Sequence, residues 1–290
     1  MNPELPTHAP AVLSTSQRTA LISLLADEDP GVHEMVRARL ISYGSEAIPW
    51  LKPYLLHDDP ILRRRAREVV QHFQRQESDS RFLAFCMNHG EDLDLEYGAG
   101  LLAQTRYPEA NLEALQAVVD TAANELRTRI QPTISPQQQL LVMNQYLFSD
   151  QGYRGAQRYE SDPENCYLNR ILERRTGNPI GLCAVYLFLC RRLGLPVAGI
   201  GLPGHFVCRF QSATLELYID CFNQGRFLTK GDCIRHLHAT NHGLHEGYLA
   251  PVSTRRILMR MCANLQQTYL QTDNLEEAGR VKRYLVALAN

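Results

Sequence analysis

The sequence predicts an α+β fold in which helices precede and follow a short antiparallel sheet. Residues 180–193 form a strongly apolar helical pattern that ends at Gly194-Leu195-Pro196, and glycine commonly follows the last residue of a helix. Three short β-type runs come directly after it, at Val197–Ile200, 206–210 and 215–219, and a turn follows at 222–227. A buried helix followed by an antiparallel sheet is typical of the α+β class.

The composition favours a folded protein of about two domains. The chain has 290 residues, which at about 150 residues per domain predicts roughly two. Hydrophobic residues make up 44%, which supports a packed core and excludes wholesale disorder. Lys plus Arg is 30 and Asp plus Glu is 31, and the net charge of −1 argues against a broad nucleic-acid surface. The longest clean apolar run, 184–190, is much shorter than the roughly 20 residues of a membrane span.

The cysteine pattern favours reduced thiols. None of the eight cysteines forms a Cys-x-x-Cys pair, and the first residues carry neither a basic start nor an apolar stretch of a secretory signal. We therefore expect a cytoplasmic protein with free thiols.

Before the apolar helix, the chain predicts a tail at 1–15 and helical repeats at 16–78. Asp29-Pro30 and Asp59-Pro60 each suit a helix start, because Asp caps the helix and Pro fits its first turn. They lie 30 residues apart, and a second helix is expected at 48–56. The same offset aligns Val36 with Ala66 and Leu40 with Val70. The stretch resembles HEAT-like repeats, which stack helix pairs around a continuous core.

Further helices are expected on both sides of the sheet. Residues 80–160 continue as helices, 149–163 are expected to be a long surface loop, and 165–175 form a helix that Asn165 caps. After the sheet, 254–270 and 274–289 predict a helical hairpin, with Glu276 and Arg280 as an i,i+4 ion pair.

Several ordered motifs between about residue 95 and the C-terminus resemble the SirB-type transglutaminase-like family. The motifs are Asn144-Gln145-Tyr146-Leu147-Phe148, Gly152-Tyr153-Arg154-Gly155, Asn165-Cys166-Tyr167-Leu168, Arg175-Thr176-Gly177-Asn178-Pro179-Ile180-Gly181-Leu182, Arg192-Leu193-Gly194-Leu195-Pro196-Val197, Pro203-Gly204-His205-Phe206 and Ile219-Asp220-Cys221-Phe222-Asn223-Gln224-Gly225. The resemblance implies a papain/transglutaminase-like core at 79–249, with a central helix on an antiparallel sheet. It also implies that 250–290 form a tetratricopeptide-like hairpin.

The resemblance implies a Cys-His-Asp arrangement. His205 would be the base and Asp220 would orient its imidazole. The nucleophile would lie at the start of the 180–193 helix, where the helix dipole and the histidine lower a thiol pKa. Pro179 occupies that position in this chain, and Gly181 replaces the serine usual in the family.

Two thiols are the remaining candidate nucleophiles, Cys183 and Cys166. Cys183 follows Pro179 by one helical turn, where the dipole effect fades and an apolar setting would make the thiol inert. The expected cleft is lined by Asn165, Asn178, Pro179 and Gly204. Backbone amides from Asn178 to Ile180 could hold an oxyanion, although Pro179 removes one donor.

A histidine-rich segment opens a metal alternative. The segment contains Cys233, His236, His238, His242 and His245. These spacings could supply zinc ligands, but Gly243 and Gly247 favour a solvated loop beside the cleft, so we expect no metal and no cofactor.

Two functional hypotheses follow. The favoured hypothesis is a non-catalytic or weakly active protein that binds a protein or peptide and neither nucleic acid nor membrane. The alternative is a cysteine-dependent amide hydrolase or acyltransferase using Cys183 or Cys166 with His205 and Asp220.

Overall fold

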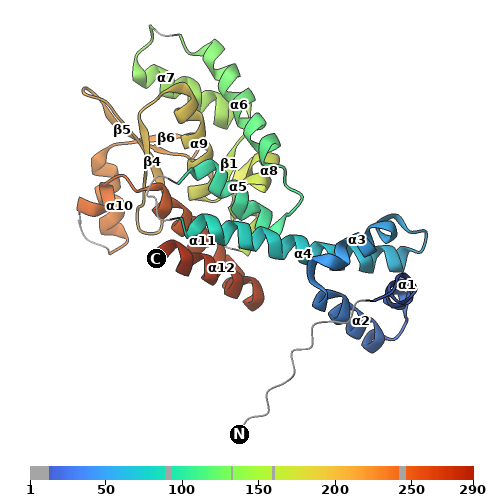
Figure 1. Ribbon diagram of the computed structural model, residues 1–290. Helices are drawn as coiled ribbons and strands as arrows, with labels where there is room; N and C mark the ends of the chain where they lie inside the picture. The colour runs from blue at the N-terminus through green and yellow to red at the C-terminus, as the bar shows by residue number, and fades with distance from the viewer. Residues whose placement is uncertain (1–12, 89–92, 132, 159–160, 242–245) are drawn as a thin grey trace. The chain divides into compact units, whose positions relative to one another are not determined.

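The computed structural model describes residues 13–88, 93–131, 133–158, 161–241 and 246–290 (Figure 1). The chain forms two compact units, Met1–Asp79 and Ser80–Asn290. The boundary between them falls within a single long helix, α4 (Pro60–Cys86). None of the helices in the described part of the chain is both long and apolar enough to cross a membrane.

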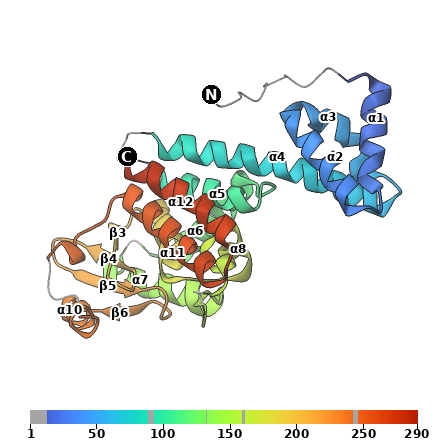
Figure 2. The ribbon, with the colours of Figure 1, turned by 90° about the horizontal axis from the view of Figure 1, so that it is seen from below.

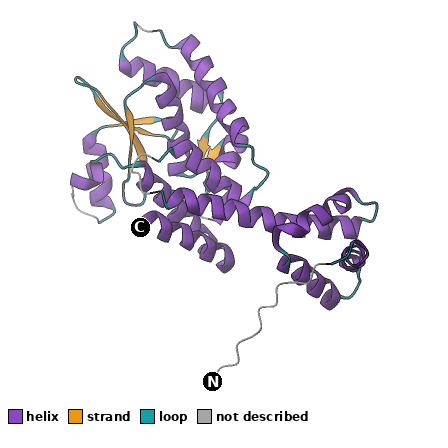
Figure 3. Cartoon of the chain, viewed as in Figure 1, coloured by secondary structure: helices purple, strands orange, loops and turns teal. Residues whose placement is uncertain are grey.

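The first unit is built from helices (Figure 3). They are α1 (Thr15–Ser23), α2 (Pro30–Ser42), α3 (Ala47–Leu51) and the first part of α4, joined by 3-10 turns at Leu24–Ala26, Gly44–Glu46 and Lys52–Leu56. Both predicted Asp-Pro helix starts are confirmed: Oδ1 of Asp29 accepts from the Gly31 N–H and Oδ1 of Asp59 from the Ile61 N–H, each at 2.8 Å. The residues that the 30-residue offset aligns are all buried.

The second unit is organised around α9 (Pro179–Leu193). Eleven of its 15 residues are buried, so the helix is enclosed rather than amphipathic. Asn178 caps its start and Gly194 ends it in the left-handed conformation. The other helices are α5 (Leu95–Arg106), α6 (Leu112–Arg129), α7 (Pro136–Asn144), which continues as a π-helical turn at Gln145–Asp150, α8 (Leu168–Arg174), α11 (Thr254–Gln271) and α12 (Leu275–Ala289). Figure 2 shows α11 and α12 lying side by side.

The main sheet is antiparallel with the strand order β3-β4-β5-β6. Its strands are β3 (Val197–Ile200), β4 (Val207–Gln211), β5 (Glu216–Asp220) and β6 (Arg226–Leu228). The first strand has its predicted bounds, and the next two begin and end one residue later than predicted. β6 was not predicted, because three residues directly after a turn carry little periodic signal.

Three local predictions are wrong. The expected surface loop at 149–163 contains a short strand, β1 (Arg154–Gly155), which pairs in parallel with β2 (Thr176–Gly177) and is flanked by the buried Tyr153 and Ala156. Asn165 does not cap a helix: it lies in a 3-10 turn (Pro163–Cys166) that Asp162 caps, and α8 begins later. Arg280 pairs with Glu277 at 2.7 Å, three residues away, rather than with Glu276.

The histidine-rich segment is helical where it is described. Cys233, His236 and His238 lie in α10 (Lys230–Ala239), and Cys233 is buried. Thr229 caps this helix in a reciprocal bond with Asp232, which explains why it forms despite the glycines that follow. The predicted ligands His242 and His245 lie outside the described residues. A 3-10 turn (Glu246–Leu249) follows.

We expect Gly225→Ala to destabilise the second unit far more than Gly194→Ala. Both glycines have a positive φ, 72° and 69°, which costs an alanine about 1 kcal/mol. An added Cβ at Gly225 would also lie 2.6 Å from Asn144 Cγ and Phe148 Cε2, whereas Gly194 has open space around it. Crowding of this kind adds about 1–3 kcal/mol. Urea unfolding of both variants measures the difference, and equal losses would contradict the packing at Gly225.

Candidate functional site

An imidazole and a carboxylate, His205 and Asp220, form the centre of the candidate site. The sheet register pairs Cys208 with Ile219, which places His205 diagonally across from Asp220. Nε2 of His205 lies 3.0 Å from Oδ1 of Asp220, a contact that becomes an ion pair when the imidazole is protonated. The backbone N–H and the Nδ2 of Asn223 donate to the two carboxylate oxygens at 3.1 and 2.8 Å, which holds Asp220 in place.

The surroundings bias this pair toward its charged form. Burial by itself would lower the pKa of His205, but the contact with Asp220 outweighs it and raises the pKa above the usual value. Burial by itself would raise the pKa of Asp220, but His205 and the N–H groups of Asn223 lower it below the usual value. The pair is therefore biased toward imidazolium and carboxylate.

Two rings enclose the imidazole of His205. The ring of Phe222 lies edge-on with its centroid 6.1 Å away, and the ring of His236 lies 6.0 Å away. Nε2 of His236 is 3.0 Å from the Pro203 carbonyl, which makes it a donor there. His236 therefore contributes to the packing around His205, a role that the sequence did not indicate.

A cleft of about 230 Å³ opens beside His205. We call it the His205 cleft; it is lined by Pro179, Gly204, His205, Phe206, Arg260, Asn264, Gln267, Thr268 and Gln271. Pro179 and Gly204 were predicted to line it, and the α11 residues were not. A signal for them exists in the sequence, because the polar residues Arg260, Asn264, Gln267 and Gln271 recur at the spacing of one helix face.

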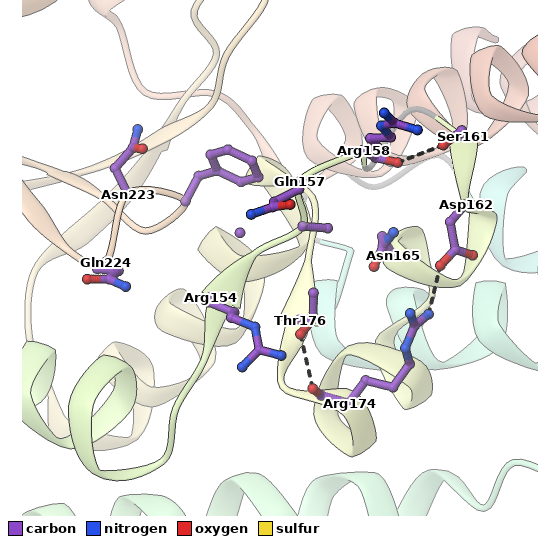
Figure 4. Close-up of a pocket in the computed structure, with 13 residues that line it drawn as sticks. Arg154, Gln157, Arg158, Ser161, Asp162, Asn165, Arg174, Thr176, Asn223 and Gln224 are labelled. Carbon is purple, nitrogen blue, oxygen red and sulfur yellow. Dashed lines mark hydrogen bonds and ion pairs between the residues drawn. The ribbon is translucent and has the colours of Figure 1, made fainter.

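The two predicted asparagines lie away from this cleft. Asn178 is 1% exposed, its Oδ1 accepts from the Gly181 N–H at 2.8 Å, and its own N–H donates to the Asn165 carbonyl at 3.0 Å. Pro179 has no N–H, so two of the three residues expected to hold an oxyanion offer no free donor. Asn165 lines a different pocket of about 800 Å³, together with Arg154 and Asn223 (Figure 4).

Neither candidate thiol lines the His205 cleft. Cys183 is fully buried, and its Sγ donates to the Phe206 carbonyl at 3.5 Å. Burial raises its pKa well above the usual value, and the nearby His205 offsets only part of that rise. Burial also raises the pKa of Cys166 to about 12, although bonds from Thr268 and Asn178 oppose the rise. Both thiols are therefore protonated and enclosed at neutral pH.

Cys183 belongs to a buried cluster with Cys208 and Cys221. The three sulfur atoms lie within 4.8 Å of one another, and three thiolates at this spacing could hold a soft ion such as zinc. Burial opposes ionisation, but contacts from Cys183 and Cys221 outweigh it and lower the pKa of Cys208 to about 6. Within the described residues no other His, Cys, Asp or Glu completes the set. Cys183 Sγ donates to the Phe206 carbonyl and Cys221 Sγ to Cys208 Sγ, so all three sulfur atoms have a partner without an ion.

The residues that line the His205 cleft include no thiol and only one hydroxyl. Thr268 carries the one hydroxyl among the nine lining residues, and it donates to the Asn264 carbonyl at 3.0 Å. The imidazole of His205 has no thiol beside it among the residues that line the cleft. The arrangement therefore presents donors and positive charge but no activated nucleophile.

Comparisons with known proteins agree with this architecture. The profile of the transglutaminase-like superfamily matches residues 113–263. A UPF0162 protein of Xylella fastidiosa strain Temecula1 is 34% identical over 196 residues, which cover 66% of this chain and 70% of that protein. A UPF0162 protein of Pseudomonas aeruginosa is 32% identical over 124 residues, 42% of this chain and 45% of that protein. Human F-box only protein 21 is 32% identical over 145 residues, which cover 46% of this chain and 22% of that protein. No solved structure matches.

We expect a thiol placed at residue 179 to be reactive where the native thiols are not. Pro179→Cys puts the sulfur in the first turn of α9 and in the cleft with His205, which together lower a thiol pKa. At pH 6.5 the new thiol should be alkylated by iodoacetamide at least tenfold faster than Cys166 or Cys183, as measured by peptide mass spectrometry.

The matched control is the same variant with His205→Ala, which should slow alkylation at residue 179 and leave the native thiols unchanged. Fast alkylation of native Cys183 or Cys166 below pH 7 that depends on His205 would contradict the structure.

The His205–Asp220 pair should stabilise the fold most between about pH 4 and 6.5. The raised pKa of His205 contributes stability below about pH 6.5, and this is lost as the pH rises through its folded-state pKa. The lowered pKa of Asp220 contributes stability above about pH 4, and this is lost as the pH falls through its folded-state pKa. Asp220→Asn should therefore cost about 3 kcal/mol near pH 5.5 and less at pH 8.

Urea unfolding at several pH values measures this difference. The exposed Glu109→Gln serves as the control, and its effect should not change between pH 5.5 and 8. A loss in Asp220→Asn that grows toward pH 8 would show that the pair is not charged in the folded protein.

Proposed function

Because the chain belongs to the transglutaminase-like superfamily and neither candidate thiol lines its His205 cleft, we propose that it binds a protein or peptide there. In this proposal the protein is non-catalytic or weakly active and has a regulatory role. The bound group is a side chain that ends in a carboxamide or a carboxylate.

The composition of the His205 cleft carries the proposal. None of its nine lining residues is acidic, while His205 and Arg260 bring positive charge. Asn264, Gln267 and Gln271 add carboxamides that both donate and accept. A cavity of about 230 Å³ suits one side chain rather than a whole peptide. A glutamine or glutamate side chain satisfies these donors without leaving a buried acceptor unpaired.

The absence of an activated thiol from the cleft supports binding over catalysis. The alternative, a cysteine-dependent amide hydrolase or acyltransferase, needs a thiolate within reach of His205. Cys183 and Cys166 are buried and have raised pKa values, and Asn178 already uses its N–H. These features favour a protein that retains the fold and the imidazole–carboxylate pair while lacking the reacting group.

The wider assignments complete the proposal. Within the superfamily we place the chain in the SirB-type subfamily, with HEAT-like repeats at 16–78, the core at 79–249 and a tetratricopeptide-like hairpin at 250–290. The protein acts in the cytoplasm on a protein or peptide partner and binds neither nucleic acid nor membrane. The balanced charge and the match to UPF0162 proteins support these assignments.

A peptide titration tests the proposed cleft. We expect capped Gly-Gln-Gly and Gly-Glu-Gly to shift the NMR signals of α11 and His205 saturably, and capped Gly-Leu-Gly to leave them unchanged. Asn264→Leu and Gln267→Leu should each weaken binding roughly fivefold, since each removes one hydrogen-bonding group worth about 1 kcal/mol. The exposed Gln116→Leu on α6 is the control and should bind as the wild type does.

Catalysis is measured in the same samples. Release of ammonia or cleavage of these peptides by the wild type, abolished in His205→Ala, would replace the binding proposal with the enzyme alternative. Shifts confined to residues outside the cleft would place the peptide site elsewhere.

A further inference from the structure

A second and larger cavity is lined in part by Phe222, whose ring also contacts the imidazole of His205. It forms where the β1 segment, the 3-10 turn before α8, the α8–β2 connection and the β5–β6 turn meet, and its volume is about 800 Å³ (Figure 4). We call it the arginine pocket, because Arg154, Arg158 and Arg174 line it. Four of the motifs that carry the family resemblance contribute to its wall, and the proposed function makes no use of it.

The charge of the arginine pocket is positive. Arg174 already forms two ion pairs within the protein, since its Nη1 lies 2.9 Å from Asp162 and 3.1 Å from Glu164. The guanidinium groups of Arg154 and Arg158 are exposed and make no hydrogen bond or ion pair with any other residue in the described part of the chain. Asp162 is the one acidic residue among the described residues that line the pocket, and Arg174 already pairs with it. Two cations therefore remain available to a ligand.

Carboxamides line the pocket beside these cations. Asn165 is only 3% exposed, yet neither atom of its side-chain amide bonds to another described residue. Such a buried polar group costs stability unless a partner arrives. On the opposite wall, Asn223 uses Nδ2 to hold Asp220, and Gln224 is exposed. Carboxamides of this kind match the alternating donors and acceptors of a peptide backbone.

We propose that the arginine pocket binds an acidic segment of a protein partner, with side-chain carboxylates on Arg154 and Arg158 and the main chain against Asn165 and Asn223. The proposal rests on the proposed function in that the ligand is a peptide. Guanidinium groups pair well with carboxylates, and a volume of about 800 Å³ accommodates a few residues. A nucleic-acid ligand is disfavoured because the chain as a whole carries a net charge of −1.

Fluorescence anisotropy with a capped, fluorescein-labelled hexaglutamate tests the proposal at 50 mM salt. We expect saturable binding that Arg154→Glu/Arg158→Glu weakens at least tenfold and Arg154→Gln/Arg158→Gln weakens less. Both arginines are exposed, so the variants should keep the thermal midpoint of the wild type. The control is Arg81→Glu/Lys282→Glu, which changes the net charge equally at exposed sites outside the pocket and should change the affinity less than twofold.

The remaining arms separate the alternatives. Equal binding of capped hexaglutamine, or equal weakening by the control variant, would overturn the proposal. So would competition by citrate at the concentration of the peptide, which would indicate a small-anion site, or tighter binding of a single-stranded hexanucleotide. Loss of hexaglutamate binding in Asn264→Leu/Gln267→Leu but not in the arginine variants would move the acidic ligand to the His205 cleft. Loss only in the arginine variants supports the pocket even if the cleft proposal fails.

Discussion

The second unit depends on the enclosure of one helix, α9. Asn178 caps the start of this helix and is buried. Its side-chain amide donates to the sulfur of Cys166, and its backbone N–H donates to the carbonyl of Asn165. The middle of α9 carries the thiols and tyrosine that pack on the sheet, and Tyr186 bonds to Asn144 at 3.0 Å. Asn144 in turn donates to the carbonyl of Gly225 in the turn after Asp220. The position of the carboxylate is thus set by the same helix that faces the histidine.

The enclosure of α9 is compatible with proline at its first position, beside the His205–Asp220 pair. Pro179 satisfies the first turn of α9 and has no N–H to leave unbonded, so it is structurally favourable where a reacting thiol would stand. His205 and Asp220 each stabilise the charged form of the other at a mostly buried position, so loss of either one would leave a buried charge without a partner. In the proposed function, the imidazole of His205 serves as a recognition group.

The sequence predicted those parts of the fold that depend on local signals. The start of α9 beside Asn178, its end at Gly194, β3 and the two Asp-Pro helix starts all carry caps or breakers that act within a few residues. β1 and β2 could not be predicted, because two residues of strand are specified only by pairing across a long separation. At the site, the motifs led to His205 and Asp220. The spacing of its polar residues marks the α11 face in the sequence, but its position beside the cleft depends on tertiary packing. The complete burial of Cys183 depends on tertiary packing, which the hydrophobic periodicity of one helix does not predict.

Phe222 links the arginine pocket to the imidazole of His205. Its ring lines the arginine pocket and lies edge-on to the imidazole of His205, and Gly155 packs directly against it. A ligand in the arginine pocket that rotated the Phe222 ring would change the packing around His205 and therefore the pKa of His205. Thermodynamic reciprocity then requires that protonation of His205 alter the affinity of that ligand by the same factor. Any such coupling would run through the one aromatic side chain that touches both the pocket and the imidazole.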